Sequence, residues 1–232
     1  MKTLVIQFFM EPTGFAEPNF VNIGLDRELL EYSKLSARLY AEKCDADYKL
    51  VTESKINYKH PTFERMDLFH NNEWWNKYDQ ILYLDTDVIC WPKAPNIFEM
   101  YPTLDSFKPV DDKKAMLKSS DWHIERENDS ILKKFDGEIL RTKRFNAGVL
   151  MLTRSACETM KPFLDYKTFT DDDNRHLIYA MLESGVKTEY MDPLFNKKNG
   201  IDCYFGHAFG QKKFILENKV IRTARNTFKI MS

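Results

Sequence analysis

Two carboxylates interrupt an otherwise apolar stretch in the first half of the chain. In YDQILYLDTDVICW, residues 78–91, Asp85 and Asp87 stand one residue apart between ILYL and VICW. Residues 81–84 have the length and the β-forming side chains of a buried strand, so we expect both carboxylates where that strand leaves the core. Two anions this close repel each other, and a cation between them would relieve the repulsion. Carboxylate oxygens suit a hard divalent ion such as Mg²⁺ or Mn²⁺, although Asp also favours plain turns.

A second group of residues, near the C-terminus, offers chemistry that complements the two carboxylates. It lies in HAFGQKK, residues 207–213. The imidazole of His207 is a good third ligand for Mn²⁺, although a lone histidine is more often a surface or core residue. Gly210 would let the backbone approach a phosphate closely, and Lys213 would hold a diphosphate as a point charge, with Lys212 as the competing contact.

The elements that must position these residues alternate in the first 85 residues. We predict strands over 3–9, 48–52 and 81–84, and helices over 22–43 and 61–75. The first helix has one apolar face, formed by residues spaced three or four apart: Leu25, Leu29, Tyr32, Leu35 and Leu39. This alternation describes a Rossmann-like half, in which ligands bind at the carboxyl ends of the strands. Asp85 and Asp87 follow the third strand, where a nucleotide would lie.

The second half of the chain is less regular. Residues 92–143 contain several prolines and charged runs, and we predict loops with short elements there, forming a lid or a ligand-facing surface. Residues 145–152 predict a strand that Ala147 and Gly148 interrupt early, and a helix begins at Ser155. A clear helical pattern covers residues 171–184, with Gly185 just past its end. We therefore expect one α/β domain.

Composition limits the classes of partner and compartment. Lys and Arg total 34 and Asp and Glu total 35 among 232 residues, so the balance of charge favours neither nucleic acid nor an anionic membrane. The four cysteines form no CxxC pair, which indicates buried free thiols. The N-terminal apolar run is short for a signal peptide, and no run approaches the roughly 18 residues of a membrane span. We expect a cytoplasmic protein without a membrane anchor.

Several segments resemble one enzyme family. YDQILYLDTDV resembles the strand and DxD segment of GT-A fold glycosyltransferases, particularly family 8, the group of glycogenin and the bacterial lipooligosaccharide galactosyltransferase. Five further segments resemble motifs of that family in the same order along the chain: FERM at 63–66, RFNAGVLML at 144–152, TDDDN at 170–174, LFN at 194–196 and HAFGQKK at 207–213. Two departures stand out. Phe214-Ile215 replaces a Pro-Trp pair, and Asp172 replaces a glutamine near the reacting sugar carbon, which leaves donor identity and stereochemistry open.

The resemblance implies a GT-A fold, in which a Rossmann-like mixed central sheet is flanked by helices in a single domain covering residues 1–232. Residues 1–90 would be the nucleotide-binding half and residues 91–232 the half that faces the donor sugar and the acceptor. Asp85, Asp87 and His207 would hold Mn²⁺ or Mg²⁺. Asp172 and Lys213 would be catalytic, with Lys213 stabilising the leaving UDP. The remaining implied contacts to a UDP-sugar are Phe8, Arg65, Thr86, Asn146, Ala147, Asp173 and Gly210.

Some of these residues have simpler interpretations. Helix N-termini favour Asp, so one of Asp171, Asp172 and Asp173 caps the helix, and the other carboxylates accept hydrogen bonds from donor hydroxyls. Phe8 would wall the uracil pocket or pack in the core. Arg65 is otherwise a surface charge. Asn146 is unusual inside a strand unless its amide is used.

The expected activity is therefore transfer of a sugar from a UDP-sugar to a glycan or glycoconjugate acceptor, with retention of configuration. UDP-glucose is the first expected donor and UDP-galactose the second. Two alternatives remain open. A haloacid-dehalogenase-type phosphohydrolase also places DxD after a strand, but nearer its N-terminus, and a non-catalytic module that binds nucleotide sugars or glycans would keep the same fold.

Overall fold

The first three predicted strands form one side of a mixed sheet. The computed structural model describes residues 1–10, 27–56, 61–111, 135, 139, 142–143, 145–165, 173–208 and 213–228. Five strands of the sheet lie in the order β2-β1-β3-β6-β5. Their bounds are β1 Thr3–Phe8, β2 Asp47–Val51, β3 Gln80–Leu84, β5 Lys108–Asp111 and β6 Phe145–Thr153. The β1, β2 and β3 strands are parallel, whereas β6 runs antiparallel to both of its neighbours.

A small second sheet continues from the carboxyl end of β3. Its strands lie in the order β4-β8-β7 and are β4 Val88–Cys90, β7 Lys197–Lys198 and β8 Phe205–His207. The β4 and β8 strands are antiparallel and pair Val88 with His207. The chain therefore passes from the large sheet into the small one through the three residues 85–87, which include both carboxylates of the DxD segment.

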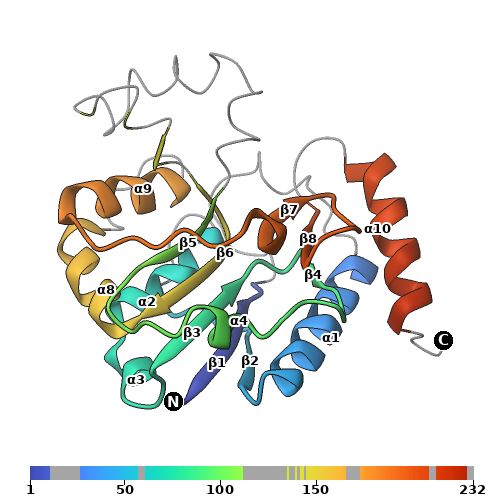
Figure 1. The fold of residues 1–232 in the computed structure, drawn as a ribbon, viewed down its shortest axis with the longest axis horizontal. Coiled ribbons are helices and arrows are strands. Elements are labelled where there is room, and N and C mark those ends of the chain that lie inside the picture. The colour runs from blue at the N-terminus through green and yellow to red at the C-terminus, as the bar shows by residue number, and fades with distance from the viewer. Residues whose placement is uncertain are drawn as a thin grey trace.

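Helices cover both faces of the large sheet (Figure 1). Alternate residues of β1 enter different core clusters: Leu4 and Ile6 pack with α2, α8 and α9, whereas Val5 packs with α1. The α-helices are α1 Arg27–Lys43, α2 Asp67–His70, α3 Asn72–Trp75, α4 Ile97–Met100, α8 Arg154–Met160, α9 Asp173–Ser184 and α10 Lys213–Phe228. Burial on both faces explains why these strands read as continuous apolar runs in the sequence. The α/β fold class is as expected, and α10 lies beside α1.

The predicted helix over 61–75 is wrong in its continuity. A 3₁₀ helix, Pro61–Met66, leads into α2, and α3 follows separately. Asn71 breaks the path because its backbone is extended, with φ −100° and ψ 106°, while its side chain accepts a hydrogen bond from the backbone N–H of Glu73. An asparagine that caps a new helix competes with continuation of the old one. Trp74 and Trp75 of α3 are buried in the same core cluster as Leu4 and Ile6 of β1.

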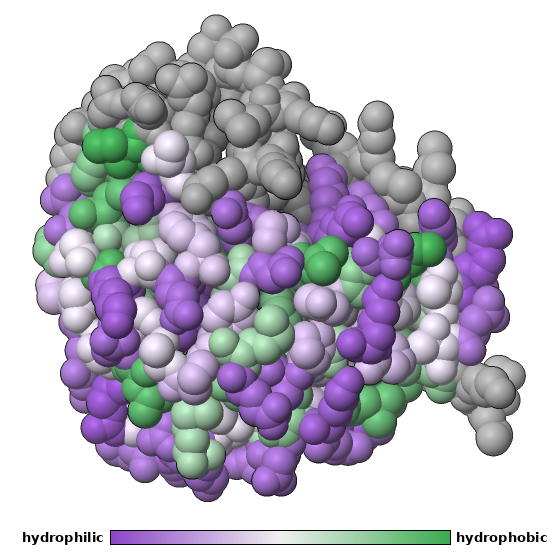
Figure 2. Space-filling model, viewed as in Figure 1, coloured by the Kyte–Doolittle hydropathy of each residue, from purple (hydrophilic) through white to green (hydrophobic). Residues whose placement is uncertain are grey.

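The predicted apolar face of the first helix is partly wrong. Leu29 and Tyr32 are buried, but Leu35 is half-buried and Leu39 is 40% exposed. The inward face carries small residues, including Ser33 and Ser36, because α1 lies close against β4 and bonds to it through their hydroxyls. In Figure 2 hydrophilic residues are interspersed with apolar ones on the face shown. Among the described residues, the exposed large apolar side chains are Met1, Leu39, Met100, Leu104 and Ile139.

One more prediction about a strand needs correction. The β6 strand runs through Ala147 and Gly148 without a break, so the predicted interruption is wrong. The β5 strand is one of the short elements expected among the loops of residues 92–143, and its edge away from β6 is bonded to residues 187–191, where the carbonyl of Pro109 accepts the N–H of Met191. All four cysteines are free and buried, as expected. In the part of the chain that the structure describes, no helix is both long enough and apolar enough to cross a membrane.

Candidate metal centre

The turn that carries the DxD segment is held at both ends by buried polar groups. The N–H of Asp85 donates to the carbonyl of Gly148 on β6 at 2.8 Å. Gln7 of β1 donates from Nε2 to the carbonyl of Asp85 at 3.2 Å and to the hydroxyl of Ser33 at 2.9 Å. Ser33 in turn donates to the carbonyl of Val88 at 2.7 Å. These bonds satisfy buried carbonyls at the point where the chain changes sheets, so the position of the two carboxylates is fixed by β1, β6 and α1 together.

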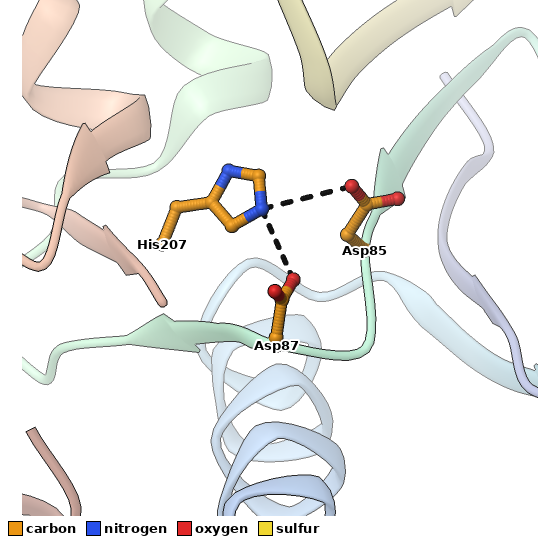
Figure 3. Close-up of side chains that lie close together, drawn as sticks. All are labelled: Asp85, Asp87 and His207. Carbon is orange, nitrogen blue, oxygen red and sulfur yellow. Dashed lines mark ion pairs between the residues drawn. The ribbon is translucent and has the colours of Figure 1, made fainter. Parts of the chain in front are cut away.

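His207 reaches this turn through the pairing of β8 with β4. The N–H of Ala208 donates to the carbonyl of Asp87 at 3.0 Å, next to the Val88–His207 pair. The Nε2 atom of His207 lies 3.0 Å from Asp87 Oδ1 and 3.7 Å from Asp85 Oδ2 (Figure 3). The imidazole is buried, whereas both carboxylates are half-buried. Three residues separated by up to 122 positions thus present one ligand atom each toward a common point.

The donor set fits a hard divalent cation. Among the described residues, Asp85, Asp87 and His207 form a group whose ligand atoms all lie within 4.8 Å of one another. Two carboxylates with one imidazole suit Mn²⁺ or Mg²⁺, and their partial exposure leaves room for oxygens of a substrate. Burial opposes protonation of the imidazole, but the carboxylates of Asp87 and Asp85 outweigh burial, so the pKa of His207 is raised above its ordinary value. The same negative charge that holds a proton there would attract a metal ion.

The second oxygen of Asp85 is engaged elsewhere. Arg65 donates from Nη2 to Asp85 Oδ1 at 3.1 Å, and the hydroxyl of Tyr83 donates to the same oxygen. Burial raises the pKa of Tyr83 well above its ordinary value, so the phenol stays protonated and remains a donor. With Oδ1 held in this way, Oδ2 is the oxygen of Asp85 that faces His207. The carboxylate is therefore oriented to bind a cation through one oxygen.

Arg65 is a buried junction between several elements. Its side chain is 4% exposed, and the guanidinium lies 4.7 Å from the centre of the Tyr83 ring. In addition to Asp85 it contacts Asp173 Oδ2, at 2.9 Å from Nε, and donates from Nη1 to the carbonyl of Ala147 at 2.6 Å. The surface-charge alternative for Arg65 is wrong, because two carboxylates and the backbone carbonyls of Thr62 and Ala147 compensate its charge inside the protein. Asp173, the first residue of α9, is correspondingly buried.

Gly148 gives His207 the space that it occupies. A Cβ atom added to Gly148 would lie 2.1 Å from Cε1 and 2.5 Å from Nδ1 of the imidazole, far inside van der Waals contact. Asn146, two residues earlier on β6, accepts a hydrogen bond from the N–H of Gly148 through Oδ1 at 2.9 Å. The amide of Asn146 is thus used inside the strand, as its unusual position in the sequence indicated.

The structure brings most of the described candidates together. Asp85, Asp87 and His207 share one point, and Thr86 lies between the two carboxylates in the chain. The remaining neighbours named above are Arg65, Asn146, Ala147 and Asp173. Phe8 is buried beside Tyr83, with ring centres 6.2 Å apart, so it packs in the core. Asp172, Gly210, Lys212 and the side chain of Lys213 lie outside the described residues.

Sequence reasoning missed several residues of this centre. Gln7, Ser33 and Tyr83 position the turn, and Asn196 contacts His207. A polar side chain within the apolar strand TLVIQF was a signal for Gln7, since such a group must find a buried partner. Asn196 lies in the LFN segment, which the sequence singled out without a role.

Comparison with known proteins gives a clear result for the fold only. No protein-family model matches the sequence, and no curated protein sequence matches it. A glycosyltransferase involved in glycosylation of the major capsid of PBCV-1 matches in structure with a TM-score of 0.59 and 12% identity, over 96% of this chain and 100% of that one. The fold is that of GT-A glycosyltransferases. The resemblance in the sequence motifs and the likeness in structure therefore agree.

Two other solved structures support the same conclusion about the fold. Galactosyltransferase LgtC, solved with donor and acceptor sugar analogs, matches with a TM-score of 0.53 and 12% identity, over 99% of this chain and 96% of LgtC. Glycosyltransferase GlyE from Streptococcus pneumoniae matches with a TM-score of 0.53 and 13% identity, over the whole of this chain and 61% of GlyE.

Proposed function

We propose that this protein is a metal-dependent glycosyltransferase that moves a sugar from a UDP-sugar to a hydroxyl group of a glycan or glycoconjugate. One observation carries the proposal: Asp85, Asp87 and His207 converge at the carboxyl end of β3, in a fold that the solved glycosyltransferases share. Ligands of open α/β sheets bind at that end of the strands. UDP-glucose is the first donor to test and UDP-galactose the second.

Each residue of the centre would have a separate role in binding the metal ion and the diphosphate. Asp85 and Asp87 would hold Mn²⁺ or Mg²⁺ through carboxylate oxygens and His207 through Nε2. When bound, the ion supplies positive charge that favours departure of the diphosphate. Arg65 and Tyr83 keep Asp85 oriented, and Lys213 would add a point charge against the leaving UDP. Residues 1–90 would serve the nucleotide, and residues 91–232 would face the donor sugar and the acceptor and would add His207 and Lys213 to the diphosphate site.

The donor sugar would be held on the β6 and α9 side of the centre. Asn146, Ala147 and Asp173 lie there, and Asp172 precedes α9 in the sequence. A carboxylate at this position would accept hydrogen bonds from sugar hydroxyls, and the guanidinium of Arg65, with Nε 2.9 Å from Asp173 Oδ2, places positive charge beside it. We propose retention by front-face displacement, in which an oxygen of the leaving phosphate accepts the proton of the acceptor hydroxyl. A dedicated catalytic base is then not required.

The test is release of UDP from a panel of UDP-sugars, with and without Mn²⁺. The proposal expects release that depends on both the metal and one preferred sugar. A haloacid-dehalogenase-type phosphohydrolase would instead cleave a generic phosphomonoester and ignore UDP-sugars. A binding module would bind a UDP-sugar without releasing UDP. Either of these two results would overturn the proposed activity.

The Asp87→Ala variant tests the assignment of the site. Charge stabilisation by a catalytic metal is worth several kcal/mol, which corresponds to a loss of at least roughly a hundredfold in the metal-dependent rate. Asp105→Ala is the matched control, because Asp105 is an exposed aspartate paired with Lys187 on the surface. We expect the control to keep the wild-type rate. A fully active Asp87→Ala enzyme would show that the metal is bound elsewhere.

A further inference from the structure

The second ring nitrogen of His207 contacts Asn196, whose role was not predicted from its sequence motif. Nδ1 lies 2.8 Å from Oδ1 of Asn196, within a buried environment, while Nε2 faces the two carboxylates. Which ring nitrogen keeps its proton is decided by the groups around both. If Asn196 presents an oxygen to Nδ1, the proton stays on Nδ1, and Nε2 is the nitrogen that can offer a lone pair.

The orientation of the Asn196 amide follows from its other neighbours. Nδ2 of Asn196 lies 3.2 Å from both the backbone carbonyl and the side-chain Oδ1 of Asn146. That Oδ1 accepts the backbone N–H of Gly148 at 2.9 Å, and a backbone N–H can only donate, so the Asn146 oxygen is an acceptor in place. Asn196 must therefore direct its NH₂ group toward Asn146. Its oxygen is left to face His207.

The surroundings keep Asn196 from turning away. It ends the 3₁₀ helix Pro193–Asn196, and Asp192 caps that helix by accepting the N–H of Leu194 at 2.8 Å. The preceding Phe195 is fully buried against Phe205 of β8, the strand that carries His207. Asn196 is itself 7% exposed. The amide and the imidazole are thus held in one packed unit.

We propose that Asn196 is a positioning residue that keeps the proton of His207 on Nδ1 and thereby presents Nε2 to the metal ion. The inference rests on the proposed metal-dependent function. Without Asn196, the neutral imidazole would keep its proton on Nε2, where Asp87 Oδ1 lies 3.0 Å away and accepts it. A proton between Nε2 and Asp87 occupies the place of the metal. The chain from the Gly148 N–H through Asn146 and Asn196 would then decide which side of the ring is available.

Calorimetry would compare Mn²⁺ binding by wild type and by Asn196→Leu. Leucine has a volume similar to that of asparagine but offers no acceptor to Nδ1 of His207. We expect affinity to fall by roughly 10- to 100-fold, as when partners of other metal ligands are removed. Asn96→Ala is the control, because Asn96 caps α4 by accepting the N–H of Phe98 and lies outside the centre. It should lose thermal stability and keep wild-type affinity.

A second measurement needs no variant. In ¹⁵N-histidine-labelled, metal-free wild type, at a pH where the ring is neutral, we expect His207 to show a protonated Nδ1 and an unprotonated Nε2. A proton on Nε2, or unchanged Mn²⁺ affinity in Asn196→Leu while wild type binds the ion, would overturn this inference alone. Failure of wild type to bind Mn²⁺ at all would overturn the proposed metal centre, and this inference with it.

Discussion

Gly148 matters because it lacks a side chain at the surface that His207 contacts. Its backbone is not in the left-handed region, so the cost of Gly148→Ala comes from the collision with the imidazole. We expect Mn²⁺ affinity to fall by at least about tenfold, because the ring must move away from the carboxylates. Overpacking should also lower the free energy of unfolding by about 1–3 kcal/mol. Calorimetry and urea denaturation measure the two effects, and wild-type affinity in this variant would contradict the packing described above.

Arg65 should contribute to stability independently of any substrate. Arg65→Met leaves the half-buried Asp85 and the buried Asp173 without their shared cation, and breaking such a pair costs roughly 3–5 kcal/mol. Arg225→Met is the matched control, because Arg225 is paired with Glu28 on the surface, where an ion pair is worth at most about 1 kcal/mol. Urea denaturation of the metal-free proteins compares the two. Equal losses of unfolding free energy in the two variants would contradict the burial of the Arg65 guanidinium between Asp85 and Asp173.

The sequence identified the ligands of the centre better than their supports. Asp85 and Asp87 are visible because they break an apolar run, and His207 because of its neighbours in HAFGQKK. The burial of Arg65 could not be read in the same way, since it depends on β6 and α9 meeting β3 in space. Asn196 likewise has a role only once β8 has placed His207 beside it. The local sequence pattern is enough to identify a candidate metal ligand. The residues that contact that ligand depend on which strands and helices meet in the folded protein.

At the scale of elements, α1 holds the metal-binding turn through a hydroxyl. Ser33→Ala would leave the carbonyl of Val88 without this donor and would remove one of the two acceptors of the Gln7 amide, while the carbonyl of Asp85 remains. Leaving buried polar groups unsatisfied costs about 1–3 kcal/mol, which we expect as the loss of free energy of unfolding. Leu39→Ala on the same helix is the control, and as a surface change it should stay within about 0.5 kcal/mol of wild type. Denaturant curves that rank the two variants in the opposite order would contradict the packing of α1.

The elements themselves were predictable where one physical signal dominated. Buried apolar runs marked β1 and β3 within one residue of their bounds, and Gly185, at φ 62°, marked the end of α9. Prediction failed where a local side chain or the tertiary context took over. Asn71 divided a helix by capping the next one, and the close approach of α1 to β4 turned Ser33 and Ser36 inward and left Leu39 exposed.

For the whole molecule, protons and metal should compete through His207. Its raised pKa means that the charged imidazole stabilises the metal-free fold below the unfolded value of about 6.5, and that this stability is lost as pH rises through the folded pKa. Stabilisation by Mn²⁺ should grow over the same interval, reaching about 2.7 kcal/mol at a hundred times Kd, because the ion needs the deprotonated ring. Melting curves from pH 6 to 8 with EDTA or Mn²⁺ measure both trends.

His70 must be separated from this result. Burial lowers the pKa of His70, so its contribution to stability is lost as pH falls. This pH dependence runs opposite to that of His207. The His207→Asn variant keeps His70, and subtracting its curve from that of wild type isolates His207. A difference that stays flat across the interval would contradict the electrostatic environment assigned to the imidazole.

The placement of the three ligand residues has a mechanical consequence. Asp85 follows the last residue of a strand in the larger sheet, whereas His207 ends a strand in the smaller one. An ion bound by both side chains would link two sheets that are hydrogen-bonded separately. Occupancy of the site would therefore limit the motion of the smaller sheet relative to the larger one. The backbone amides of residues 205–207 would exchange with solvent more slowly when the ion is bound.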